Sequence, residues 1–85
     1  MANEKYVLEE FLRDEGYLFD HMLERCGRAI REGQGSEMIE TGRWEVEIDY
    51  HTRAVNICDT LEPFDIWAMT LDEFMAVLRD TPRDR

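Results

Sequence analysis

Apolar and polar residues alternate strictly from Trp44 to Tyr50, and this is the clearest pattern in the chain. A period of two puts alternate side chains on opposite faces of a β-strand, so one face of this segment is buried and the other faces water. A polar connection at residues 51–53 separates it from a second alternating segment, residues 54–58. Because the connection lacks an Asn-Gly pair, we expect a hairpin with a loop of about three to five residues.

The water-facing side of the first strand carries three carboxylates, Glu45, Glu47 and Asp49. None of their cross-strand neighbours on that face is basic, since these come from Ala54, Asn56 and Cys58. Charge pairing across the hairpin therefore cannot neutralise the three acids. The pattern predicts an acidic sheet surface that suits a basic partner, although a solvated strand with incidental charge would show the same alternation.

Residues 4–32 carry apolar side chains at spacings of three and four, which is typical of one stripe on a helix. Asn3 is a suitable N-cap, and Gly33 stands where a glycine often ends a helix. The stripe keeps its phase across Gly16, so we expect one long helix, bent at most. At about 1.5 Å per residue this helix is longer than a small hairpin can cover, which predicts a homodimer through its free part.

The remaining segments complete an α+β prediction. Met38-Ile39 can form a short extra strand, and residues 64–69 follow Pro63 as a third strand of the sheet. Thr70 and Glu73 have the spacing of a capping box, which predicts a helix over residues 71–79. The expected fold is a long N-terminal helix, an antiparallel sheet of roughly two to four strands within residues 44–69, and a C-terminal helix on the same face, in the order α-β-β-β-α.

Length and charge narrow the function classes. The 85 residues (1–85) suit a single small domain, and an apolar content of 44% is too high for intrinsic disorder. Acids outnumber bases 20 to 10, which disfavours direct binding to nucleic acid or to anionic lipid, because phosphate contacts require Lys and Arg. The chain has neither a long apolar run nor an apolar signal core near its start, so we expect a cytoplasmic protein without a membrane span.

Candidate chemistry is sparse. The soft metal ligands lack a zinc-binding spacing: His21, Cys26, His51 and Cys58. The loop acids around Pro63 do not match a calcium loop, and Ser36 is outside any nucleophile motif. We therefore expect two reduced thiols, no metal, no cofactor and no enzymatic activity.

Three further residues are candidates for contact with a partner: His51, Asp65 and Trp67. Trp44 has the buried phase of its strand, but Trp67 would face solvent or a partner if helices cover only one side of the sheet. The alternative is that the C-terminal helix covers it. His51 is expected to be exposed in the hairpin loop. The predicted partner-binding set is therefore Glu45, Glu47, Asp49, His51, Asp65 and Trp67.

In size and charge the chain is similar to immunity proteins and other small inhibitors that neutralise nucleases or nucleic-acid-binding machines. The resemblance implies an acidic module that masks a basic surface of a protein partner. Two alternatives remain open. One is a phage-type nucleic-acid mimic, which needs the acids of the N-terminal helix and the hairpin to form one continuous strip. The other is a homodimeric accessory or structural subunit whose acids serve only solubility.

Overall fold

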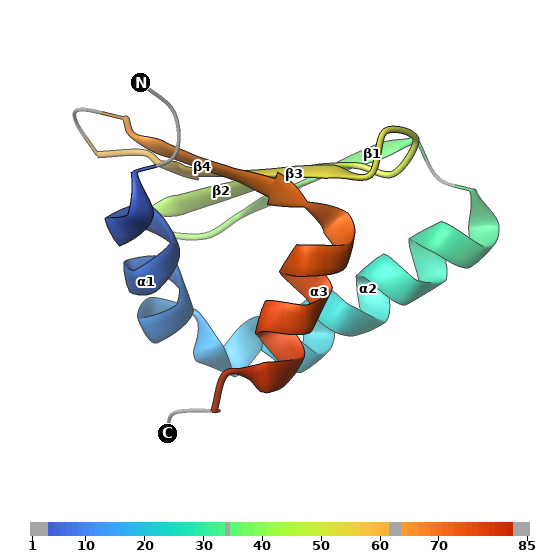
Figure 1. The fold of residues 1–85 in the computed structure, drawn as a ribbon, viewed down its shortest axis with the longest axis horizontal. Coiled ribbons are helices and arrows are strands. Elements are labelled where there is room, and N and C mark those ends of the chain that lie inside the picture. The colour runs from blue at the N-terminus through green and yellow to red at the C-terminus, as the bar shows by residue number, and fades with distance from the viewer. Residues whose placement is uncertain (1–3, 34, 62–63, 83–85) are drawn as a thin grey trace.

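The computed structural model describes residues 4–33, 35–61 and 64–82, and it has the α+β fold that the sequence predicts (Figure 1). The helices are α1 (Lys5–Asp14), α2 (Phe19–Glu32) and α3 (Leu71–Asp80), with a short 3-10 turn η1 (Gly16–Leu18) between the first two. The strands are β1 (Ser36–Glu40), β2 (Trp44–Asp49), β3 (Ala54–Asp59) and β4 (Ile66–Thr70). All four strands form one antiparallel sheet in the order β1-β2-β3-β4.

The sheet is an antiparallel meander that is wider than the predicted range of residues 44–69. The extra strand at Met38-Ile39 is confirmed as part of β1, so the sheet begins at Ser36. The loop between β2 and β3 spans residues 50–53, as predicted from the missing Asn-Gly pair. The capping box is also confirmed: Thr70 Oγ1 accepts from the Glu73 N–H at 3.0 Å, and Glu73 Oε1 accepts from the Thr70 N–H at 3.0 Å. α3 therefore begins where predicted and runs one residue further.

The helices cover one face of the sheet, and the core lies between the two layers (Figure 1). α1 packs against β3 and β4, and α3 packs against α2, β3 and β4. Trp44 is fully buried, as predicted, and its ring meets the Phe11 ring edge-on with centroids 6.1 Å apart. The inward side chains of the central strands complete the sheet side of the core: Val46, Ile48, Val55 and Ile57.

The prediction of one continuous helix over residues 4–32 is wrong. α1 ends at Asp14, and the chain turns through η1 before α2 begins at Phe19. Phe11 and Phe19 both enter the core, with ring centroids 6.4 Å apart. A straight helix would separate these two residues by about 12 Å along its axis, since they are eight positions apart. The observed order is therefore α-α-β-β-β-β-α, and the predicted helix overhang that favoured a dimer seam does not form.

Candidate functional site

The face of the sheet opposite the helices bears the side chains that alternate with the core, and we call it the open face (Figure 1). Strand register arranges it in three rows across β1, β2, β3 and β4. The first row is Ser36, Asp49, Ala54 and Thr70, the second is Met38, Glu47, Asn56 and Ala68, and the third is Glu40, Glu45, Cys58 and Ile66. The register confirms that Ala54, Asn56 and Cys58 neighbour the three acids of β2.

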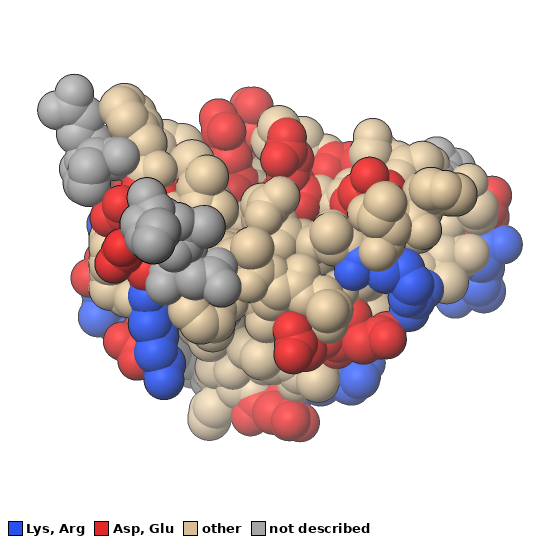
Figure 2. All heavy atoms as spheres, turned by 45° about the horizontal axis from the view of Figure 1, so that its top comes forward, with Lys and Arg blue, Asp and Glu red and all other residues tan. Residues whose placement is uncertain are grey.

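Among the residues that the structure describes, the strands present no basic side chain on the open face, and they present four carboxylates: Glu40, Glu45, Glu47 and Asp49. Figure 2, which turns the sheet side toward the viewer, shows acidic side chains along the upper edge of the molecule with uncharged ones between them. Within the described ranges, no ion pair reaches Glu40, Glu45 or Glu47. The negative charge of this face is therefore unneutralised by the described part of the chain.

Two of these acids lie directly opposite each other. Glu40 of β1 is the cross-strand partner of Glu45 of β2. Like charges in such a pair destabilise a sheet, because the side chains are held within about 5 Å of each other at Cβ. The field of this region also acts on Cys58, the cross-strand neighbour of Glu45 on the other side. Burial raises the pKa of the Cys58 thiol, and the charges of Glu45, Asp59 and Glu47 raise it further.

Asp49 has a different role from the other open-face acids. Its Oδ1 accepts hydrogen bonds from the backbone N–H groups of His51 at 2.9 Å and Thr52 at 3.2 Å. These bonds, that of Thr52 first, lower the pKa of the Asp49 carboxyl. Asp49 therefore stabilises the β2–β3 loop in its ionised form, while Glu45 and Glu47 keep their oxygens available.

The open face is hollowed by two adjoining depressions. One, of about 310 Å³, is lined by Met38, Glu45, Glu47, Asn56, Cys58 and Ile66. The other, of about 580 Å³, extends toward the β2–β3 loop and also includes Met38, Glu47 and Asn56 in its lining. Glu47 and Asn56 are therefore positioned to contact anything that enters either depression.

Exposed apolar side chains lie at the same end of the sheet as the Glu40–Glu45 pair. Leu61 and Phe64 are each 56% exposed, and Ile66 of the open face is 36% exposed. Backbone bonds hold this segment, because the Phe64 N–H donates to the Leu61 carbonyl at 2.8 Å and the Leu61 N–H donates to Asp59 Oδ1 at 3.0 Å. Acidic and apolar surface therefore adjoin, as they do in many protein interfaces.

Some of the acids away from the open face are neutralised by Arg43, and the sequence analysis did not identify these pairs. Arg43 Nη1 lies 3.0 Å from Glu10 and 3.9 Å from Asp14, and its guanidinium also pairs with the buried Asp59. Arg43 lies over the Trp44 ring, 4.4 Å from its centroid. No spacing rule connects these positions, since only the fold brings α1 and the β1–β2 turn together. Glu10 and Asp14 of α1 are therefore part of an internal network centred on Arg43.

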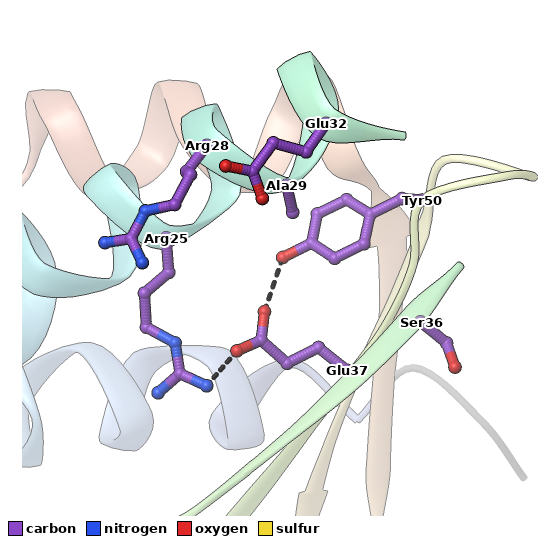
Figure 3. Close-up of a pocket in the computed structure, with 7 residues that line it drawn as sticks. All are labelled: Arg25, Arg28, Ala29, Glu32, Ser36, Glu37 and Tyr50. Carbon is purple, nitrogen blue, oxygen red and sulfur yellow. Dashed lines mark hydrogen bonds and ion pairs between the residues drawn. The ribbon is translucent and has the colours of Figure 1, made fainter. Parts of the chain in front are cut away.

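A second candidate site is a pocket of about 310 Å³ between α2 and the β1 edge of the sheet (Figure 3). Figure 3 shows Arg25 and Tyr50 pointing toward Glu37 from opposite sides. Arg25 pairs with Glu37 Oε2, and the Tyr50 hydroxyl donates to Glu37 Oε1 at 2.7 Å. Both oxygens of the carboxylate are thus occupied by partners within the chain, which fits a clamp between α2 and the sheet better than a catalytic group.

The structure brings together only part of the predicted partner-binding set. Glu45, Glu47 and Asp49 share the open face, and His51 is exposed in the loop as predicted. Asp65 lies outside the sheet and accepts from the Tyr6 hydroxyl at 2.7 Å. Trp67 is on the helix-covered face opposite Ile57, half-buried against the core. The sequence analysis missed Glu40, Met38 and Ile66. Alternation gives each edge strand two faces, and only the strand register shows that these three residues lie on the open one.

Comparison with protein-family models, with curated proteins and with solved structures finds no match for this chain. Among the described residues, no group of three or more His, Cys, Asp or Glu side chains is placed to hold a metal ion. No helix within residues 4–33, 35–61 and 64–82 is both long and apolar enough to cross a membrane. Both cysteines are free, Cys26 in the core and Cys58 half-buried on the open face.

Proposed function

We propose that this protein is a small acidic binding module whose open face masks a basic surface of a partner protein, in the manner of an inhibitor or immunity protein. The observation that carries the proposal is an uncovered sheet face with four carboxylates and no cation. Such a face attracts a positively charged surface over a long range and accelerates association at low salt. A nuclease or another nucleic-acid-binding protein has a surface of this kind, because it must contact phosphates.

The backbone that bears Glu45 and Glu47 is held in place before any partner arrives. Glu45 and Glu47 stand on β2, which is hydrogen-bonded to a strand on each side and backed by buried Trp44 and Val46. Side chains two residues apart on one strand are about 7 Å apart, so the spacing of the charges is set by the backbone. Because the backbone is already ordered, binding does not have to order it, which favours affinity.

The same geometry gives less support to the alternatives. A nucleic-acid mimic needs one continuous acidic strip, but the α1 acids Glu10 and Asp14 lie on the helix side and pair with Arg43. A homodimer through the N-terminal helix depended on one long helix that overhangs the sheet, and the break at η1 removes that overhang. In the pocket of Figure 3, the Glu37 carboxylate is already paired with Arg25 and Tyr50, which gives no support to an acid–base role there. We therefore favour masking of a basic protein.

The test is capture of partners from a lysate of the source organism on immobilised protein. The wild type is compared with Glu45→Lys/Glu47→Lys, and with Glu9→Lys/Glu24→Lys, which changes the net charge equally on exposed helix positions. We expect the wild type and the helix variant to retain a basic protein that the open-face variant does not retain. The complex should dissociate as ionic strength rises, since salt screens exposed charges. Equal retention by all three proteins would exclude the open face as the binding surface.

A further inference from the structure

We propose that the depression lined by Glu45 and Glu47 receives an arginine side chain of the partner, with its guanidinium between the two carboxylates and its aliphatic stem within the apolar walls that Met38 and Ile66 form on opposite sides. This inference rests on the proposed function and adds the chemistry of the central contact. The depression has a volume of about 310 Å³, and Asn56 and Cys58 of β3 also line it.

Charge complementarity identifies the occupant as a cation. Glu40 and Glu45 repel each other across the β1–β2 pair, and no described basic side chain relieves this repulsion. Two other acids of the sheet do have a cation within the chain, since Asp59 pairs with Arg43 and Glu37 pairs with Arg25. Natural sequences usually remove such local conflicts, and the places where one persists are often functional. A cation supplied by a partner would resolve this one.

The lining of the depression favours a guanidinium over an ammonium. Met38 and Ile66 present apolar atoms beside the carboxylates, and they are exposed without a partner, 45% and 36% respectively. A guanidinium is planar and weakly hydrated, and its five N–H donors can reach two carboxylates at once. An ammonium is strongly hydrated, so it loses more hydration free energy than a guanidinium when it contacts apolar walls. Both the charge and the walls therefore fit arginine.

The probe is the peptide acetyl-Gly-Arg-Leu-Arg-Gly-amide, compared with matched peptides in which citrulline or lysine replaces both arginines. Titration into ¹⁵N-labelled protein should shift the amides of residues 38–40, 45–47, 56–58 and 66. We expect affinity about tenfold above that of the uncharged citrulline peptide and about threefold above that of the lysine peptide. Shifts spread over the exposed acids of all helices, or equal affinity for the arginine and citrulline peptides, would overturn the inference.

Two variants separate this inference from the proposed function. Met38→Ser/Ile66→Ser removes the apolar walls and keeps every charge, and both side chains are exposed enough for the fold to tolerate it. Glu45→Gln/Glu47→Gln removes the charges and keeps the walls. We expect the first to weaken arginine-peptide binding about fivefold and the second to abolish it. If only Glu45→Gln/Glu47→Gln weakens binding of the arginine peptide, the arginine pocket is wrong and the acidic docking surface stands. If neither double variant weakens binding of the arginine peptide, both proposals fail.

Discussion

The guanidinium of Arg43 binds the buried carboxylate of Asp59 at two points, Nη2 to Oδ2 at 2.8 Å and Nε to Oδ1 at 3.1 Å. Asp59 is only 2% exposed, and it also accepts from the Leu61 N–H and from the Tyr6 hydroxyl. The pair therefore connects the β1–β2 turn, the end of β3, the segment after it and α1. It holds the end of the sheet where the Glu40–Glu45 pair lies.

Replacing Asp59 with Asn should destabilise the protein by about 2–3 kcal/mol, because Arg43 loses a charged partner in a largely dry site. Urea unfolding followed by tryptophan fluorescence measures the effect. The control is Asp72→Asn, which removes the exposed pair with Arg53 and should cost no more than about 0.5 kcal/mol. Similar losses in the two variants would show that the Asp59 network contributes no more than a surface ion pair.

Acid should destabilise the wild type through Asp59 and Asp49. Arg43 lowers the pKa of Asp59, and the backbone N–H groups of Thr52 and His51 lower that of Asp49. The unfolded chain therefore binds protons first as the pH falls, so this stabilisation is present above about pH 5 and is lost at lower pH. Urea midpoints between pH 3 and 7 should rise with pH, and the rise should be smaller in Asp59→Asn.

Glu15 should show the opposite dependence on pH. It is 7% exposed at the junction of α1 and η1, and one of its oxygens is buried without a hydrogen-bond partner among the described residues. Burial raises the pKa of its carboxyl, so the folded state keeps this proton to a higher pH than the unfolded chain does. The folded state therefore loses stability as the pH rises from the pKa of the unfolded chain to that of the folded state. The stability of Glu15→Gln relative to wild type should therefore increase between pH 4 and pH 8. A constant difference would contradict a raised pKa.

Replacing Glu40 with Lys should stabilise the sheet and weaken partner binding at the same time. The substitution converts a repulsive cross-strand pair with Glu45 into an attractive one, worth about 0.2–1 kcal/mol. Thermal unfolding measures the gain, and the peptide titration measures the loss of binding. If the melting temperature rises and the affinity stays the same, the Glu40–Glu45 repulsion has no part in recognition.

We expect the residues of the pocket in Figure 3 to stabilise the fold and to have no part in partner binding. Tyr50→Phe removes the hydroxyl that donates to Glu37 and should cost about 1 kcal/mol of stability, since Glu37 keeps its contact with Arg25. Capture of the basic partner should be unchanged. Loss of the partner with the fold intact would move the functional site from the open face to this pocket.

Sequence patterns were sufficient where a local rule governs the backbone. Alternation around Val46 decides which β2 side chains are buried, because a strand has only two faces. The Thr70–Glu73 box decides where α3 begins, since each residue satisfies a free N–H at that end. The acidic half of the candidate site follows from the same alternation, as Glu45, Glu47 and Asp49 share one side of one strand.

Tertiary structure decided the features that depend on contacts between distant segments. The apolar stripe remains in phase across Gly16, but the helix breaks there, and the break allows Phe11 and Phe19 to pack against each other in the core. Arg43 finds Asp59 and Glu10 through the packing of α1 against the sheet. The register of β4 turns Trp67 to the covered face and Ile66 to the open one, and register is a property of strand pairing that one strand's sequence does not contain.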